Sequence, residues 1–409
     1  MNSHTGSLAI DLPSIGRLPW YQRRIVDYLT RLREGSVQVS FGGARRFEIK
    51  GREAGPASDM TIHRPVSLLR RLFWRGDLGF AESYMAGDWE SETPAALLEL
   101  FARNLDAYEK TESRHGLVRL ASRARHWLNR NSRSGSRRNI AAHYDLGNDF
   151  YRQWLDGTMT YSAALFADAN ESLEVAQQRK YARILAMLGA RPGQRILEIG
   201  CGWGGFAEYA ARQGYRVTGL TLSREQLAYA QRRIDDAGLS ERVDFRLCDY
   251  RDFDGVVDHI VSIEMFEAVG QEYWRTYFET LSQRLAPGGR AALQVITIDE
   301  SQFEQYAANP GGFIQTYIFP GGMLPTKTHL VELGQSAGLS MHDDMYPFGV
   351  DYADTLSCWF DAFGGCTEWL ETRGYDERFR RMWRYYLAFC EAGFRSGDID
   401  VVQVAFEKA

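Results

Sequence analysis

Two hydrophobic periodicities divide the chain. In residues 36–41 and 46–49, apolar side chains occupy every second position, which predicts two half-buried strands near the N-terminus. Residues 94–105 instead repeat apolar side chains with the spacing of a helix. The part of the chain before about residue 110 is therefore predicted to form a small module of strands and helices.

From about residue 139 onward, helical and strand patterns alternate. Residues 172–188 predict an amphipathic helix that ends at Gly189, and the helix after Ser223 begins with the capping-box pattern Ser223 to Gln226. Strands are predicted at residues 196–199, 215–220, 243–247, 258–263 and 290–296, the last after a turn at 286–289. This order predicts an α/β domain with a parallel sheet covered on both faces, whose ligands bind at the carboxyl ends of the strands.

Composition narrows the class of protein. The 409 residues suffice for two or three domains, and 44% hydrophobic with 25% charged residues is ordinary for a globular protein. A net charge of −5 gives no reason to expect a nucleic-acid partner. The five cysteines are dispersed and contain no C-x-x-C pair, so neither disulfides nor a metal site is expected. The first 19 residues lack the pattern of a signal peptide, and no apolar run spans a membrane; a cytoplasmic location is expected.

The most informative segment runs from residue 196 to 205. An apolar strand carrying Glu198 leads into glycines at 200, 202 and 204, which allow a sharp turn and close approach of a ligand. This spacing also fits a dinucleotide fingerprint, and a purely structural turn is a further alternative. The acidic residue on the strand, together with a second strand that ends in Thr-Gly-Leu-Thr-Leu-Ser at 218–223, resembles the nucleoside end of an S-adenosylmethionine (SAM) methyltransferase.

Further motifs make the resemblance specific. The chain resembles the bacterial cyclopropane-fatty-acyl-phospholipid synthases in their two-domain form, over nearly its whole length. The motifs that carry this resemblance lie at residues 76–89, 143–151, 159–162, 196–205, 219–223, 265–267, 317–322 and 391–404. The resemblance implies a Rossmann-like class I methyltransferase domain with a mixed seven-stranded sheet at residues 139–409. It further implies a smaller α+β lipid-binding domain at 1–112, joined to it by a basic linker at 113–138.

The family's reaction defines the expected cofactor and partners. SAM donates a methyl group to the cis double bond of an unsaturated phospholipid acyl chain, a carbocation forms, and a bound bicarbonate removes a proton so that a cyclopropane closes. The resemblance also implies a homodimer, acting peripherally on the inner face of the membrane. The segment Arg114 to Arg138 has eight arginines, no acidic residue and interleaved apolar side chains, so we expect it to meet anionic phospholipid head groups.

Position by position, the resemblance implies a set of cofactor contacts. Tyr161 and Ser162 would reach the methionine part of SAM, and Glu198, Gly200 and Gly202 would line the cleft. Thr221, Leu222 and Gln226 would meet the ribose and the adenine edge, and Asp249 with Tyr250 would hold the adenine. Ile263 is a further expected cofactor contact. For Gln226 the alternative is a helix-capping side chain, and for Tyr250 a core aromatic.

The residues that hold the base follow from the same resemblance. Glu267 in Met-Phe-Glu, Tyr352 and the backbone at Ile296 are the expected catalytic groups, with Gln294 on the fifth strand beside them. Glu267 is expected to orient the base. Glu264 is a competitor, but its place at the end of a strand favours a structural role.

The chain departs from the family pattern at the expected bicarbonate site. Ala163 stands where the family has cysteine, Gln294 where it has histidine, and Ala268 replaces a further histidine. Either the ion site is intact and cyclopropanes form, or the cation loses its proton elsewhere and a methylene- or methyl-branched chain results. The dominance of cyclopropanation in the family favours the first product. A small-molecule N-methyltransferase and a non-enzymatic lipid carrier are the alternatives from other classes.

Overall fold

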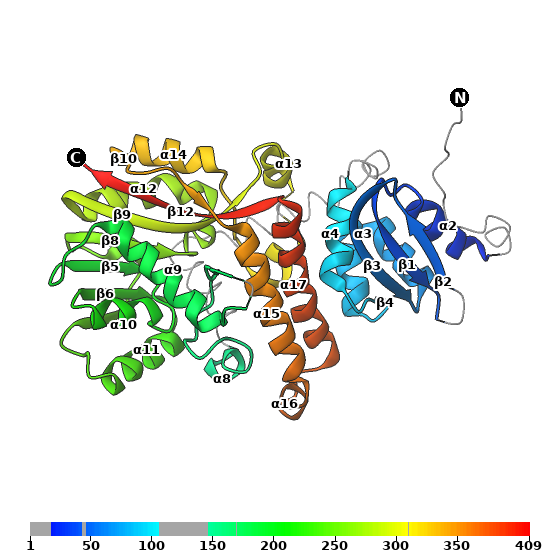
Figure 1. Cartoon of the computed structure of the whole chain (residues 1–409), viewed down its shortest axis with the longest axis horizontal. Helices are drawn as coiled ribbons and strands as arrows, with labels where there is room; N and C mark the ends of the chain where they lie inside the picture. The colour runs from blue at the N-terminus through cyan, green and yellow to red at the C-terminus, as the bar shows by residue number, and fades with distance from the viewer. Residues whose placement is uncertain (1–17, 43–45, 106–145, 169, 310) are drawn as a thin grey trace. The chain divides into compact units, whose positions relative to one another are not determined.

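The computed structural model of the chain describes residues 18–42, 46–105, 146–168, 170–309 and 311–409 (Figure 1). These residues fall into two compact units: one holds the described residues up to 105 with residues 364–396, and the other holds residues 146–363 and 397–409. The basic linker expected at 113–138, with its arginines, lies outside the described residues, as does the start of the motif at 143–151. Within the described ranges, no helix is both long and apolar enough to cross a lipid bilayer.

The first unit is built on a four-stranded sheet in the order β2-β1-β3-β4. Strand β1 pairs antiparallel with β2 and parallel with β3, and valines at alternate positions of β1 are buried. The strands are β1 (Glu34–Ser40), β2 (Arg46–Lys50), β3 (Glu53–Ile62) and β4 (Trp89–Glu90). The two strands expected from the alternating pattern are confirmed to within a residue or two.

Helices from both halves of the chain belong to this unit. The N-terminal part supplies α2 (Trp20–Leu29), α3 (Pro65–Met85) and α4 (Pro94–Arg103). Helix α4 ends two residues earlier than predicted, because the side chain of Asn104 turns back to accept hydrogen bonds from the backbone of Arg33 and Glu34 at 2.7 and 3.2 Å. Residues 364–396, expected in the catalytic domain, supply α16 (Thr367–Thr372) and α17 (Glu377–Ser396), and α17 packs on α3 and α4.

The second unit contains a mixed sheet in the order β10-β12-β9-β8-β5-β6-β7, with β11 paired to β12 (Figure 1). Strands β5 to β9 are mutually parallel, and β12 runs antiparallel to β9. The α/β class and the mixed sheet are confirmed; β11 adds an eighth strand. The strands are β5 (Arg195–Ile199), β6 (Arg216–Thr221), β7 (Val243–Leu247), β8 (Val257–Ile263), β9 (Leu285–Ile298), β10 (Leu339–Met341), β11 (Tyr346–Pro347) and β12 (Ile399–Lys408).

Helices cover both faces of this sheet, as the sequence predicts. Ile196 of β5 faces α9 (Leu173–Leu188), α10 (Gly205–Arg212) and α11 (Arg224–Asp236), whereas its neighbour Leu197 faces α12 (Trp274–Arg284) and α14 (Lys327–Ser336). This opposite orientation follows from the two-residue repeat of a strand. The remaining helices are α8 (Asn148–Tyr151), α13 (Phe303–Ala308) and α15 (Gly349–Gly365).

Two local predictions differ from the structure. The turn expected at 286–289 lies inside β9, which begins at Leu285 and is irregularly paired there with β8. At the start of α11 only half of the capping box forms: Ser223 Oγ accepts from the backbone of Gln226 at 3.2 Å, but the Gln226 side chain accepts from Thr221 Oγ1 at 2.9 Å. The helix predicted at 172–188 is confirmed, with Ser172 as its cap and Gly189 in a left-handed conformation at its end.

Candidate active site

The predicted site residues gather at one edge of the large sheet. Glu198 lies on β5, Thr221 ends β6, Ile263 ends β8, and Gln294 and Ile296 lie on β9. The carboxyl ends of parallel strands share one edge, which is where open α/β sheets bind ligands. The sheet thus brings together residues that are nearly 100 positions apart in the sequence.

The glycine turn after β5 has the geometry of a ligand cradle. The backbone of Gly200, Gly202 and Gly204 has positive φ angles of 85°, 50° and 82°, which glycine adopts without strain. A Cβ added at Gly202 would meet no atom within 4 Å, whereas one added at Gly200 would lie 2.8 Å from Met265. Open space above Gly202 is what a nucleoside at this turn requires.

A buried acid lies beside this cradle. Glu198 is buried, and its Oε2 has no hydrogen-bond partner among the described residues. Burial raises the pKa of Glu198 well above its usual range, and only the more distant charges of Lys180 and Arg233 oppose this. An orphaned carboxylate oxygen fits the cationic methionine end of SAM.

On the β6 and β7 side, the expected nucleoside contacts have partners within the protein. Asp249 is buried, and its two carboxylate oxygens accept from Arg251 Nε at 2.8 Å and from Arg251 Nη2 at 2.6 Å. Tyr250 has a buried hydroxyl with no partner among the described residues, and burial raises its pKa. Leu222 is half-buried next to the bonded pair of Thr221 and Gln226. The contacts of these residues with the cofactor remain predictions.

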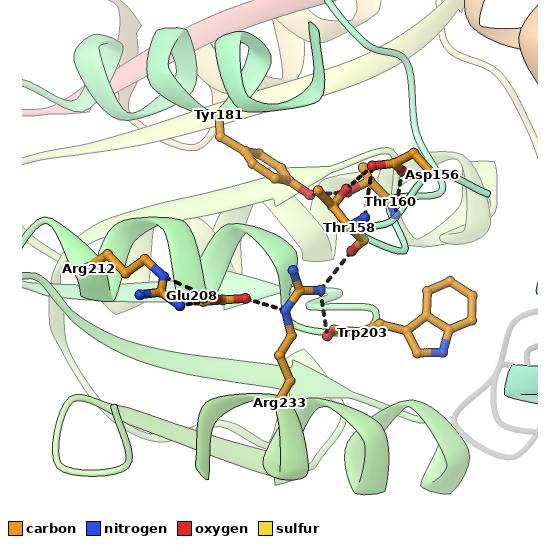
Figure 2. A network of polar contacts seen from close by, with 8 residues as sticks. All are labelled: Asp156, Thr158, Thr160, Tyr181, Trp203, Glu208, Arg212 and Arg233. Carbon is orange, nitrogen blue, oxygen red and sulfur yellow. Dashed lines mark hydrogen bonds and ion pairs between the residues drawn. The ribbon is translucent and has the colours of Figure 1, made fainter. Parts of the chain in front are cut away.

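The loop before Tyr161 is fixed by a polar network (Figure 2). The carboxylate of Asp156 accepts hydrogen bonds from the backbone and hydroxyl of Thr158, at 2.9 and 2.5 Å. Thr158 in turn contacts the hydroxyl of Thr160 at 2.7 Å, and Thr160 contacts the Tyr181 hydroxyl at 2.8 Å. The chain therefore reaches Tyr161 and Ser162 from a loop that is tied to α9.

Arg233 of α11 connects this loop to the glycine turn (Figure 2). Its Nη1 donates to the carbonyl of Thr158 at 2.7 Å and to that of Trp203 at 3.4 Å, while its Nε pairs with Glu208 at 2.5 Å. Burial alone would raise the pKa of Glu208, but hydrogen bonds from Arg233 and Arg212 outweigh it and lower the pKa. The ionised pair thus holds the loop before Tyr161 and the glycine turn together.

A buried lysine contacts the predicted methionine site. Lys180 of α9 is fully buried, and its Nζ donates to Ser162 Oγ at 2.6 Å. Burial lowers the pKa of Lys180 to about 7, against the attraction of Glu264, Asp156 and Glu198. Lys180 is not among the residues expected from the sequence. The signal was available, because a lysine occupies an inward position of a helix stripe that is apolar apart from it and Gln177.

At the end of β8, Glu264 accepts three hydrogen bonds. Its donors are the backbone of Ala163 at 2.8 Å, Gln294 Nε2 at 2.7 Å and the Tyr352 hydroxyl at 2.6 Å. Desolvation raises the pKa of Glu264, while Tyr352, Lys180, Gln294 and Ala163 all act to lower it. The hydroxyl of Tyr352, which the sequence analysis placed with Glu267, bonds to Glu264 instead.

Glu267 lies beside Glu264 in a different environment. Its Oε1 accepts from the backbone of Ile296 at 2.5 Å, and its Oε2 is buried with no partner among the described residues. Desolvation and the like charge of Glu264 raise the pKa of Glu267 to about 8, so the carboxyl is mostly protonated at pH 7. The structure places Glu267 and Ile296 together, as expected.

The donors expected around a bicarbonate ion are therefore bonded to protein carboxylates. Ala163, Gln294 and Tyr352 donate to Glu264, and the backbone of Ile296 donates to Glu267. The Gln294 amide is fixed in this role, since its Oε1 accepts from Gln403 Nε2 at 2.9 Å across the β9–β12 pair. The described residues do not fit a bicarbonate ion.

An aromatic cluster borders the two carboxyl groups. The ring of Tyr352 lies 6.1 Å from that of Trp359, which lies 5.3 Å from Tyr161 and 5.8 Å from Trp154. Helix α15 supplies Tyr352 and Trp359, and its Thr355 accepts from the backbone of Ala164 at 3.0 Å. The loop that carries Tyr161 and Ala163 is thus held against the aromatic face of α15.

Comparison with known proteins gives a consistent result. Residues 131–404 match the family model described as mycolic acid cyclopropane synthetase. Tuberculostearic acid methyltransferase UfaA1 of Mycobacterium tuberculosis is 42% identical over 368 residues, covering 85% of this chain and 82% of the relative. The cyclopropane-fatty-acyl-phospholipid synthase of Escherichia coli is 36% identical over 364 residues, covering 86% and 88%. The crystal structure of mycolic acid cyclopropane synthase CmaA1, complexed with SAH and CTAB, matches with a TM-score of 0.62 and 32% identity over 66% of this chain and 98% of that one.

Proposed function

Because the chain belongs to the mycolic acid cyclopropane synthetase family, we propose that it transfers a methyl group from SAM to the cis double bond of an unsaturated phospholipid acyl chain. It is a SAM-dependent methyltransferase of a lipid-modifying family. The observation that carries the proposal is the pair of adjacent carboxyl groups, Glu264 and Glu267, bordered by aromatic rings at the end of β8. Such a site suits a reaction that creates a carbocation and then removes a proton.

The cofactor would bind in the cradle formed by Gly200, Gly202 and the orphaned carboxylate of Glu198. When bound, SAM supplies a methyl group that the electron pair of the double bond attacks while the bond to sulfur breaks, which leaves a carbocation on the acyl chain. Arg233 and Asp156 hold the loop before Tyr161, and this loop would bring Tyr161 and Ser162 to the methionine part of SAM. These residues position the reactants rather than exchange protons.

The surroundings of the carboxyl groups favour the cation. Aromatic faces attract positive charge. The ring of Trp359 contacts the rings of both Tyr352 and Tyr161. A carboxylate that holds three hydrogen bonds is a weakened nucleophile, so it is better suited to accept a proton than to attack the cation. Water must be excluded, because hydroxide would trap the cation as an alcohol.

Two products are consistent with this chemistry. Loss of a proton from the transferred carbon, with bonding of that carbon to the adjacent cationic carbon, closes a cyclopropane. If a hydride first shifts between the two former alkene carbons, loss of a proton from the transferred carbon leaves a methylene branch, and loss from a chain carbon leaves an unsaturated methyl-branched chain. The E. coli relative is named for the first reaction. The 42% identical relative is named a tuberculostearic acid methyltransferase, and the family's cysteine and histidine are replaced here by Ala163 and Gln294. These two observations favour the open-chain product, which we place first.

The substrate is proposed to lie in a membrane. Binding of anionic head groups by residues 114–138, action on the inner membrane face and a homodimer are parts of the same proposal and rest on the sequence. Vesicle co-sedimentation that weakens steeply with salt supports the head-group contact, and salt-independent binding contradicts it.

The decisive experiment follows a labelled methyl group. Cells expressing the chain are given labelled methionine, and their lipids are analysed by mass spectrometry with fragmentation or NMR, since the ring and methylene products have equal mass. Label at the former double bond supports the proposal and identifies the product. If a soluble amine carries the label and no acyl chain does, the proposed lipid reaction is wrong and the protein is a small-molecule methyltransferase.

A further inference from the structure

We propose that Glu264 is itself the base of the reaction, in the position where the sequence resemblance implies a bound bicarbonate. This inference rests on the proposed function. In the step, the carboxylate takes a proton from the methylated acyl cation, and the electron pair of the broken C–H bond stays on carbon and neutralises the cation. The proton then leaves Glu264 for solvent, so that no oxidant or reductant is required.

The first support is the arrangement of donors. Three groups from three separate segments converge on one side-chain carboxylate: the backbone of Ala163, the amide of Gln294 and the hydroxyl of Tyr352. Glu264 Oε1 accepts from Ala163 and Gln294, and Oε2 accepts from Tyr352. A carboxylate and a bicarbonate offer the same planar pair of oxygens, so the same donors hold either one.

The second support is the difference between the two neighbouring glutamates. Adjacent titratable groups whose environments separate their pKa values mark the base and its neutral companion. Three donors and the charge of Lys180 favour the ionised form of Glu264. Glu267 receives one backbone donor, and its pKa is raised to about 8. Burial raises the pKa of Glu264 as well, but its donors oppose that shift, so of the two carboxyl groups Glu264 has the surroundings that better stabilise a negative charge.

The third support is the backbone. Glu264 has a φ of 49°, one of two non-glycine residues with a positive φ among the described residues. Left-handed backbone at such a residue costs stability and is maintained where surrounding structure enforces it, commonly at functional sites. The carbonyl of Gln294 accepts from the backbone of Glu264 at 2.8 Å, so β9 fixes both the main chain and the side chain of this glutamate.

Two variants distinguish the effect of losing the carboxylate from the effect of losing the volume of the Glu264 side chain. Glu264→Gly suits the positive φ and removes the carboxylate, leaving its three donors facing a gap of the size of a small anion. Glu264→Gln keeps the bulk of the side chain and removes the charge. Both are assayed for transfer of labelled methyl to vesicles of unsaturated phospholipid, in buffer freed of carbon dioxide.

The expected pattern is specific to an internal base. The wild type works equally well with and without bicarbonate. Both variants lose about 10²- to 10⁴-fold in turnover, the range of general base catalysis. Formate or bicarbonate restores Glu264→Gly at least about tenfold, because the added anion accepts the same hydrogen bonds, and neither anion restores Glu264→Gln.

A second readout requires neither SAM nor lipid. Carbon-13 NMR of labelled formate should show binding to Glu264→Gly and none to the wild type or to Glu264→Gln. Bicarbonate dependence of the wild type, full turnover by either variant without added anion, or equal formate binding by wild type and Glu264→Gly would overturn the inference. If the wild type labels no acyl chain, the proposed function fails, and formate binding still decides whether Glu264 occupies the anion position.

Discussion

Two glutamates three residues apart illustrate how local surroundings assign different roles to the same side chain. Glu264 and Glu267 follow β8 and differ in their hydrogen-bond donors: three act on the first and one backbone amide on the second. Desolvation and the charge of Glu264 leave Glu267 with a raised pKa of about 8. With a pKa of about 8, Glu267 is mostly neutral near pH 7.

This raised pKa predicts a pH-dependent stability. An unfolded glutamate titrates near about 4.3, so between about pH 4.3 and 8 the folded protein holds one more proton than the unfolded chain. The contribution of Glu267 to the free energy of unfolding therefore falls as the pH rises through this window. Glu267→Gln cannot ionise and lacks this loss, so its melting temperature relative to wild type should rise from pH 5 to pH 8.

Scanning calorimetry at several pH values measures this difference. Glu279→Gln, which replaces an exposed glutamate of α12, is the matched control for the loss of one carboxyl group. A melting-temperature difference for Glu267→Gln that stays constant from pH 5 to pH 8 would show that Glu267 is ionised in the folded protein.

At the scale of elements, the position of the loop before Tyr161 depends on α9 and α11. Arg233 lies between the carbonyls of Thr158 and Trp203, and its pair with Glu208 is largely buried, with 17% of each side chain exposed. Arg212 binds the same glutamate from an exposed position, with 58% of its side chain accessible. Of these two arginines, Arg233 is the one that contacts both segments flanking the cradle.

Replacing Arg233 should loosen this part of the site. Arg233→Met removes both carbonyl contacts and leaves Glu208 without its buried partner, which costs up to about 3 kcal/mol. We expect a lower melting temperature and weaker binding of S-adenosylhomocysteine by calorimetry. Arg212→Met, which breaks an exposed pair, should cost about 0.5 kcal/mol and leave affinity unchanged. Equal effects of the two substitutions would refute the positioning role of Arg233.

The same elements show which features the sequence could predict. Strand β7 and helix α9 follow from local periodicity and capping residues, because these depend on neighbours in the chain. The glycine turn was also predicted, since its positive φ angles require glycine. The partners of Glu264 were not predictable: Ala163 and Tyr352 lie 101 and 88 residues away, and only the folded sheet and α15 bring them together.

At the scale of the whole molecule, the order of segments along the chain differs from their grouping into compact units. The sequence predicts one catalytic domain from residue 139 to the C-terminus, but α17 packs with α3 and α4 in the N-terminal unit, and β12 then returns to the large sheet. The apolar stripe of α17 was visible in the sequence, but periodicity does not identify the partner of an apolar face. Arg381 of α17 donates to the carbonyl of Tyr84 at 3.3 Å, and Tyr385 contacts the ring of Tyr84 at 5.6 Å.

This packing predicts that the chain can be divided and still assemble. Residues 1–112 and 113–409, expressed together as separate polypeptides with a tag on the first, should copurify, because α17 of the second covers α3 and α4 of the first. Arg381→Glu places a negative charge near Glu90 and removes the bond to Tyr84, so it should reduce copurification. Arg378→Glu makes the same charge change on an exposed part of α17 and should not. If the two polypeptides separate on size exclusion without either substitution, α17 does not hold the N-terminal unit, and the domain boundaries expected from the sequence would be preferred.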